Sequence, residues 1–212
     1  MLVKTAFIDF VSDKISTPKI ILEIGSRDAL QSVEFSRLFP EAKIYAFECN
    51  PPSIKTCIEN AKNYKNIEIV PYAVFNKNEK GINFYPVLTN IGASSLFRFI
   101  DVYPSIPNRI QKEITVDAIR IDTWAKEKGI EKIDLIWIDL QGAGYEAFEG
   151  MGKLLSDIQA IYTEVEYQRV YKNQKLLKDI LKLLNEKGFS MIRNQPSKIN
   201  WWGKAIFINN KF

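Results

Sequence analysis

Short apolar strands alternate with helical segments along most of this chain, and this alternation restricts its fold more than any other feature. Apolar runs of strand length occur at residues 19–24, 43–47, 66–70, 133–138, 159–165, 188–192 and 204–208. Helical patterns lie between several of these runs. One ends at Pro40, a second begins at Pro51-Pro52, and a third repeats leucine and isoleucine at helical spacing before Gly188. Because such units join parallel strands through right-handed crossovers, we predict an α/β fold with a mainly parallel sheet.

Three segments depart from this rhythm. Apolar residues at helical spacing predict an amphipathic helix over residues 2–16, within an N-terminal segment 1–18. Residues 72–132 are longer than one crossover needs, and they hold alternating strands at 82–85 and 114–119 around an irregular stretch at 86–110. Residues 193–203 read as a polar loop. With no repeat or linker, we expect one domain over residues 1–212.

The chain has no histidine, which excludes Ser-His-Asp and Cys-His catalysis, histidine-ligated zinc and a histidine proton shuttle. Its two cysteines, Cys49 and Cys57, match no metal spacing and are expected to be reduced thiols of a cytoplasmic protein. No spacing of acidic residues demands a metal either. The chemistry must therefore rely on carboxylates, hydroxyls, amides or a reactive cofactor.

Charge and hydropathy indicate neither a nucleic-acid partner nor a membrane span. The 29 basic and 25 acidic residues leave a net charge of +4, and the lysines are scattered. No apolar stretch approaches the roughly 20 residues that a spanning helix needs, and Asp9, Asp13 and Lys14 interrupt the apolar residues of the N-terminus.

Polar residues at three strand ends indicate a ligand site. In an open α/β sheet, ligands bind at the carboxyl ends of the strands, and here these ends carry Glu23 and Gly25, Glu48, and Asp139. A glycine lets backbone approach a ligand, and an acid about 20 residues later suits the ribose hydroxyls of an adenosine. Glu23 and Asp139 would lie near a ligand ammonium group. Alternatively, Gly25 is a plain turn and Glu48 a solvated acid.

A dinucleotide site is the nearest competing interpretation. It requires the pattern G-x-G-x-x-G, and only Gly25 is present in the segment 25–30. Without the other glycines the loop has no pyrophosphate cradle, which disfavours NAD.

Six motifs are similar to those of a known family. They are ILEIGSRD at residues 21–28, YAFECNP at 45–51, GASSL at 92–96, IDTW at 121–124, IDLIWIDLQGA at 133–143 and YTE at 162–164. Through them, residues 19–208 resemble the FkbM-type methyltransferases, within the class I S-adenosyl-L-methionine-dependent enzymes. The resemblance implies a Rossmann-like, seven-stranded, mostly parallel sheet with an antiparallel last strand and helices on both faces.

The resemblance also implies which residues bind S-adenosyl-L-methionine, whose product is S-adenosyl-L-homocysteine. The methionine end would contact Glu23, Gly25, Ser26, Arg27 and Asp28; Glu48 would hold the ribose; and Cys49, Asn50, Tyr72 and Ala73 would flank the adenine. Asp139 and Gln141 would face the methyl group and the acceptor. Two positions depart from the family pattern: Ala29 replaces a second loop glycine, and Gly144 replaces an acid, with Glu146 two positions later.

The implied reaction is O-methylation of a sugar or another small-molecule or glycan hydroxyl. A carboxylate base gives about 10²–10⁴-fold in such a reaction, and the candidates are Asp139 first and Glu164 second; alternatively, Asp139 only positions a ligand. The acceptor is expected under residues 86–110, which include Ser94 and Ser95, and under the 193–203 loop.

Several alternatives remain open at this point. Trp201 and Trp202 suit stacking on a sugar ring or packing against the last strand. The tetrad Asn50-Pro51-Pro52-Ser53 is similar to a nucleic-acid amino-methyltransferase motif, but Pro-Pro opening a helix explains it. A catalytically degenerate binding module, or methylation of nitrogen or carboxylate, would also fit the pattern.

Overall fold

A computed structural model of the chain describes residues 3–15, 17–100 and 110–212. Its core is a seven-stranded sheet with the strand order β3-β2-β1-β7-β8-β10-β9. The strands are β1 (Ile20–Ile24), β2 (Lys43–Phe47), β3 (Ile67–Val70), β7 (Leu135–Ile138), β8 (Ala160–Glu166), β9 (Phe189–Pro196) and β10 (Trp202–Asn209). All neighbours pair in parallel except β10, which is antiparallel to both β8 and β9. The predicted mostly parallel sheet with an antiparallel last strand is confirmed.

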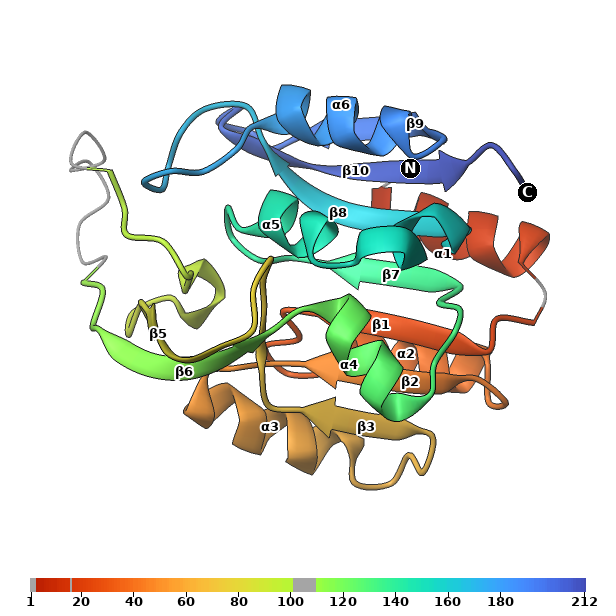
Figure 1. The fold of residues 1–212 in the computed structure, drawn as a ribbon, viewed down its shortest axis with the longest axis horizontal. Coiled ribbons are helices and arrows are strands. Elements are labelled where there is room, and N and C mark those ends of the chain that lie inside the picture. Colours follow the sequence, from red (N-terminus) through yellow and green to blue (C-terminus); the bar gives the residue numbers. More distant parts are fainter. Residues whose placement is uncertain (1–2, 16, 101–109) are drawn as a thin grey trace.

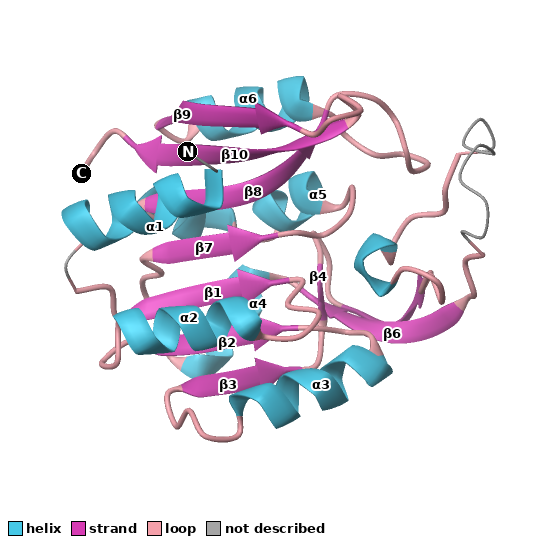
Figure 2. Cartoon of the chain, turned by 180° about the vertical axis from the view of Figure 1, so that it is seen from behind, coloured by secondary structure: helices cyan, strands magenta, loops and turns pink. Residues whose placement is uncertain are grey.

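Six helices cover the two faces of this sheet among the described residues. They are α1 (Val3–Lys14), α2 (Leu30–Leu38), α3 (Pro51–Ala61), α4 (Ile121–Lys128), α5 (Gly144–Glu149) and α6 (Leu177–Glu186). Figure 1 shows α4, α5 and α6 in front of the sheet, and Figure 2, from behind, shows α1, α2 and α3 on the opposite face. None of the helices in the described ranges has the length and apolar character that crossing a membrane requires.

Aromatic side chains of the sheet pack against α1 on its face. Trp137 of β7 stacks on Tyr162 of β8 with ring centroids 3.6 Å apart, and Phe7 of α1 packs against both rings. The predicted helix over 2–16 is thus present, although it ends at Lys14, and residues 1, 2 and 16 lie outside the described part of the chain. Asp139 lies two positions beyond Trp137, so the register that packs the Trp137 ring against Phe7 also presents the Asp139 carboxylate at the strand end.

The long segment 72–132 forms a second sheet, which was not predicted from the sequence. Its strands, in the order β4-β6-β5, are β4 (Ala73–Val74), β5 (Glu79–Phe84) and β6 (Ile114–Ile119), and a 3₁₀ turn, η1 (Ile91–Ala93), follows β5. Both views place this sheet beyond the carboxyl ends of the large sheet. The predicted strands at 82–85 and 114–119 are its antiparallel pair.

The expectation of a polar loop over 193–203 is wrong. Residues 193–196 continue β9, and Trp202 begins β10, so only the turn between them is irregular. Main-chain pairing with β10 holds this part of β9 although most of its side chains face water. An edge strand exposed on both sides has no apolar alternation that a sequence pattern could reveal.

Candidate active site

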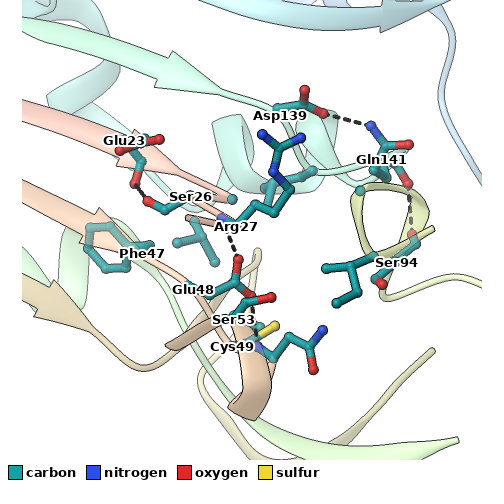
Figure 3. Close-up of a pocket in the computed structure, with 18 of the residues that line it drawn as sticks. Glu23, Ser26, Arg27, Phe47, Glu48, Cys49, Ser53, Ser94, Asp139 and Gln141 are labelled. Atoms are coloured by element: carbon teal, nitrogen blue, oxygen red, sulfur yellow. Dashed lines mark hydrogen bonds between the residues drawn. The ribbon is translucent and has the colours of Figure 1, made fainter. Parts of the chain in front are cut away.

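A cavity of about 340 Å³ lies at the carboxyl ends of β1, β2 and β7 (Figure 3). Its volume is within the usual range for small-molecule sites, roughly 300–1,000 Å³. Every residue that was expected to bind the cofactor contributes to the lining: Glu23, Gly25, Ser26, Arg27, Asp28, Glu48, Cys49, Asn50, Tyr72, Ala73 and Asp139. The cavity also touches residues that were not expected from the sequence, including Phe47, Ser53, Phe84 and Leu96.

Main-chain contacts hold the three strand ends together around Gly25. The amides of Gly25 and Ser26 both donate to the Phe47 carbonyl, at 3.0 and 2.9 Å, and the Asp139 amide donates to the Ile24 carbonyl at 2.9 Å. Gly25 has a φ of +80°, and a Cβ built there would lie 2.1 Å from the Asp139 carbonyl oxygen. Only glycine permits this approach.

The loop after Gly25 uses left-handed backbone at two further residues. Arg27 and Ala29 have φ values of 56° and 57°, a conformation that costs an alanine roughly 1–2 kcal/mol. Ala29 is fully buried against Ala46 and Cys57, and this burial offsets part of that cost. The loop therefore adopts left-handed backbone at position 29 with an alanine in place of a second glycine.

Glu48 is a buried carboxylate fixed by backbone donors. Its Oε2 accepts the Arg27 amide and its Oε1 accepts the Asn50 amide, both at 2.7 Å. Burial raises its pKa above the ordinary glutamate value, although these two bonds act in the opposite direction. Each oxygen keeps a second lone pair, so the carboxylate can accept further hydrogen bonds from a ligand in the cavity.

Glu23 connects β1 to the start of α2. Its Oε2 accepts both the amide of Ser32, at 2.8 Å, and the Ser32 hydroxyl, at 2.5 Å. Burial raises the pKa of Glu23 to about 7 despite these bonds. A cation bound nearby would favour the ionised carboxylate, which fits the expected ligand ammonium group.

Four side chains form a hydrogen-bonded group, the carboxylate cluster, which consists of Asp139, Gln141, Glu164 and Lys204. The amide nitrogen of Gln141 donates to Asp139 Oδ1 at 2.7 Å and to Glu164 Oε1 at 2.6 Å. Lys204 Nζ donates to Asp139 Oδ2 at 2.6 Å and to Glu164 Oε2 at 2.9 Å. Each carboxylate is thus held through both of its oxygens.

Two residues of the carboxylate cluster line the cavity and two do not. Asp139 and Gln141 line the cavity, as Figure 3 shows, whereas Glu164 and Lys204 are not among its lining residues. Burial and the charge of Asp139 raise the pKa of Glu164. For Lys204, burial acts to lower the pKa, but the two carboxylates outweigh it and the pKa is raised. Lys204 is therefore an ammonium ion.

Of the residues that were expected on the acceptor side, the structure places two at the cavity. Ser94 and Ser95 line the cavity beside η1, and the Ser95 hydroxyl donates to the Gln141 carbonyl at 2.7 Å. Trp201 and Trp202 are not among the lining residues. Residues 101–109 of the expected acceptor segment 86–110 lie outside the described part of the chain.

The structure also describes the two cysteines and the acid that follows Gly144. Cys49 and Cys57 are free thiols, as expected. Glu146, which follows the unusual Gly144, does not line the cavity; it is buried on α5, and burial raises its pKa to about 7. Within the described ranges, no group of three or more His, Cys, Asp and Glu side chains could hold a metal ion.

Comparisons with known proteins agree with the geometry. A family model described as the methyltransferase FkbM domain matches residues 20–191. The chain is also 30% identical over 203 residues to the 2-O-methyltransferase NoeI of Sinorhizobium fredii (strain NBRC 101917 / NGR234), covering 91% of this chain and 80% of that protein.

Solved structures share the fold at low sequence identity. Magnesium protoporphyrin IX methyltransferase (ChlM) of Synechocystis PCC 6803 with bound SAM aligns over 98% of this chain and 78% of that chain, with 13% identity and a TM-score of 0.56. An rRNA methylase of Streptococcus thermophilus aligns over 95% and 92%, with 10% identity and a TM-score of 0.55.

Proposed function

Because the chain belongs to the FkbM methyltransferase family and is an S-adenosyl-L-methionine-dependent methyltransferase, we propose that it methylates a hydroxyl oxygen of a sugar, of another small molecule or of a glycan. One observation carries this proposal: the fixed carboxylate of Glu48 and the carboxylate of Asp139 line the same cavity. The name of the relative, a 2-O-methyltransferase, supports oxygen as the acceptor atom.

The described residues fit the cofactor. Glu48 keeps unused lone pairs for the ribose hydroxyls. Cys49, Tyr72, Glu23 and Arg27 line the same cavity, where the first two would flank the adenine and the last two would bind the methionine end. The guanidinium of Arg27 suits the methionine carboxylate, and Glu23 suits the ammonium group. When bound, the sulfonium of the cofactor supplies an electrophilic methyl group.

Asp139 is the proposed general base. It lines the cavity, and 28% of its side chain is exposed, compared with 8% for Glu164. Gln141 and Glu164 support it through the carboxylate cluster. A base positioned in this way takes the hydroxyl proton while the acceptor oxygen attacks in line with the methyl group.

The acceptor is proposed to bind beside η1. Ser94 and Ser95 border the cavity there, and exposed apolar side chains of the same segment, Leu88 and Ile91, add a surface for a sugar ring. Trp202 is 37% exposed near Lys204 and supports stacking further from the cavity. We further propose that residues 1–212 form one methyltransferase domain, and that the two free cysteines reflect a cytoplasmic location.

We expect S-adenosylhomocysteine to raise the melting temperature by about 5 °C or more at a hundredfold excess over its Kd, since it binds only the native state. A labelled methyl-donor assay on sugars, nucleotide sugars, glycans, amines and carboxylic acids then identifies the acceptor class. Transfer to hydroxyls supports the proposal. Transfer only to nitrogen or carboxylate would favour a different acceptor class, and binding without turnover on any acceptor would favour a binding module.

Glu48→Ala is expected to weaken S-adenosylhomocysteine binding tenfold or more, because hydrogen bonds to a charged acceptor contribute about 1.5–3 kcal/mol each. Calorimetric titration measures the change. Glu59→Ala is the matched control, because Glu59 is an exposed acid of α3 that pairs with Lys62. Equal affinities in the two variants would remove Glu48 from the ribose site.

A further inference from the structure

Lys204 lies at the centre of the carboxylate cluster, yet neither the motifs of the sequence nor the cavity lining points to it. It comes from the antiparallel strand β10, and its register partner on β8 is Glu164. Its ammonium group contacts the Asp139 and Glu164 carboxylates at 2.6 and 2.9 Å. Only 24% of the Lys204 side chain is exposed, so its charge acts in a poorly hydrated place.

We propose that Lys204 is a positioning residue of the methyl transfer, whose ammonium ion holds the carboxylates of Asp139 and Glu164 side by side and keeps Asp139 able to accept the proton of the acceptor hydroxyl. The inference rests on the proposed function, because it assigns Lys204 a task in that reaction. Lys204 itself acts through Asp139, which is the residue facing the cavity.

The charges around the two carboxylates make a cation necessary at this place. Two carboxylates that share one site repel each other, so without a cation the pair retains a proton. Glu166 of β8 adds to this problem, because it is buried and the charges of Glu164 and Asp139 raise its pKa beyond the effect of burial. Among the described residues, Lys204 supplies the ammonium group that contacts both Asp139 and Glu164.

Other charged and polar groups around the cavity do not replace Lys204. From the β1–α2 loop, Arg27 interacts with Asp139 electrostatically, but its guanidinium pairs with Asp28 at 2.7 Å. Lys4 of α1 pairs with Glu34 instead. Tyr162 of β8, and Tyr171, which donates a hydrogen bond to Gln141 Oε1 at 3.1 Å, are uncharged phenols.

The reaction then balances with Asp139 as the proton acceptor. The acceptor oxygen forms a bond to the methyl carbon as the carbon–sulfur bond breaks, and the electron pair of that bond stays on sulfur. The hydroxyl proton passes to Asp139. Gln141 and Lys204 keep the protonated side chain in place until the proton leaves to water, and Lys204 retains its own proton throughout.

The test compares Lys204→Gln, which keeps hydrogen-bond donors without the charge, with Lys204→Arg, which keeps the charge. Carbon-detected NMR follows the carboxyl carbon of Glu164 against pH, and the signal is assigned by its loss in Glu164→Gln. Removing a contacting cation favours the protonated carboxyl, so the midpoint in Lys204→Gln is expected to rise by about 1–3 pH units. Lys204→Arg should stay near the wild-type midpoint.

The kinetic arm uses the acceptor found for the wild type. The ascending limb of kcat against pH is expected to move to higher pH in Lys204→Gln. At a pH below the ascending limbs of both proteins, each pH unit of this movement should lower kcat by about tenfold, because the ionised fraction of the base falls by that factor there. Lys211→Gln is the control. Lys211 pairs with Asp157, which precedes β8 and so lies at the end of that strand away from Glu164. It should match the wild type in both arms.

The outcomes separate this inference from the proposed function. An unmoved Glu164 midpoint in Lys204→Gln, or a moved midpoint with an unmoved kinetic profile, overturns the role of Lys204. A raised Glu164 midpoint in Lys204→Arg also overturns the role of Lys204, and this variant can be measured even if Lys204→Gln does not fold. The titration needs no acceptor, so it decides the effect of Lys204 even if no hydroxyl is methylated, a result that would overturn the proposed function alone.

Discussion

Asp139→Asn is expected to lower kcat for methyl transfer by about 10²–10⁴-fold, the usual contribution of a general base. Asparagine has nearly the same size and retains an oxygen that can accept a hydrogen bond from Lys204 or Gln141. It cannot take up a proton, however, so the acceptor hydroxyl loses its base. Single-turnover kinetics, with calorimetric titration of S-adenosylhomocysteine, separate the chemical step from cofactor binding.

Two comparisons make this result interpretable. Glu164→Gln should reduce kcat less than Asp139→Asn, because Glu164 is not among the residues that line the cavity. Asp157→Asn changes an exposed acid outside the site and should have no effect. An unchanged kcat in Asp139→Asn would remove Asp139 as the base. A loss of S-adenosylhomocysteine affinity as large as the loss in kcat would instead leave Asp139 a ligand-positioning role alone.

Much of the large sheet could be predicted because its strands are buried on both faces. Continuous apolar runs such as 43–47, which is β2 at the same bounds, need no partner to be recognised. Some boundaries elsewhere shifted where a polar side chain stands at the end of the predicted run. Asp134, for example, was expected inside a strand but precedes β7, and its carboxylate accepts the amides of Lys19 and Ile20.

The cofactor side of the cavity could be predicted for a related reason. Parallel strands bring their carboxyl ends to one edge, so Gly25, Glu48 and Asp139 are placed together by topology alone. Side-chain contacts across the sheet follow a different rule. Lys204 meets Asp139 and Glu164 only because β10 runs antiparallel beside β8 in one register, which no local pattern encodes. The available signal was a single lysine at the start of an apolar run.

Short elements were missed because they depend on tertiary contacts. Strand β4 has two residues and exists through its pairing with β6, some 45 positions later. Helix α5 has six residues and begins at Gly144, which is a poor helix former. The helix is held instead by Ala147 and Phe148, which are buried against the sheet. Propensity and periodicity carry little information over so few residues.

Gly25→Ala is expected to destabilise the protein by about 2–5 kcal/mol, the sum of the left-handed backbone cost and the cost of overpacking. The added methyl group would lie 2.1 Å from the Asp139 carbonyl oxygen and 3.2 Å from Leu140 Cδ2. The ends of β1 and β7 must then separate, which also disturbs the Arg27 amide that holds Glu48. Denaturant unfolding measures the stability, and calorimetric titration is expected to show a loss of S-adenosylhomocysteine binding.

Gly129→Ala isolates the backbone cost in this experiment. Gly129 has a φ of +69°, close to that of Gly25, but a Cβ there meets nothing within 4 Å. It lies at the end of α4, away from the cavity, so its variant should lose only about 1–2 kcal/mol and bind S-adenosylhomocysteine normally. The difference between the stability losses of the two variants measures the cost of forcing a methyl group into the close contact between β1 and β7. If both lost the same stability and both bound the ligand, the close approach at Gly25 would not be what shapes the cavity.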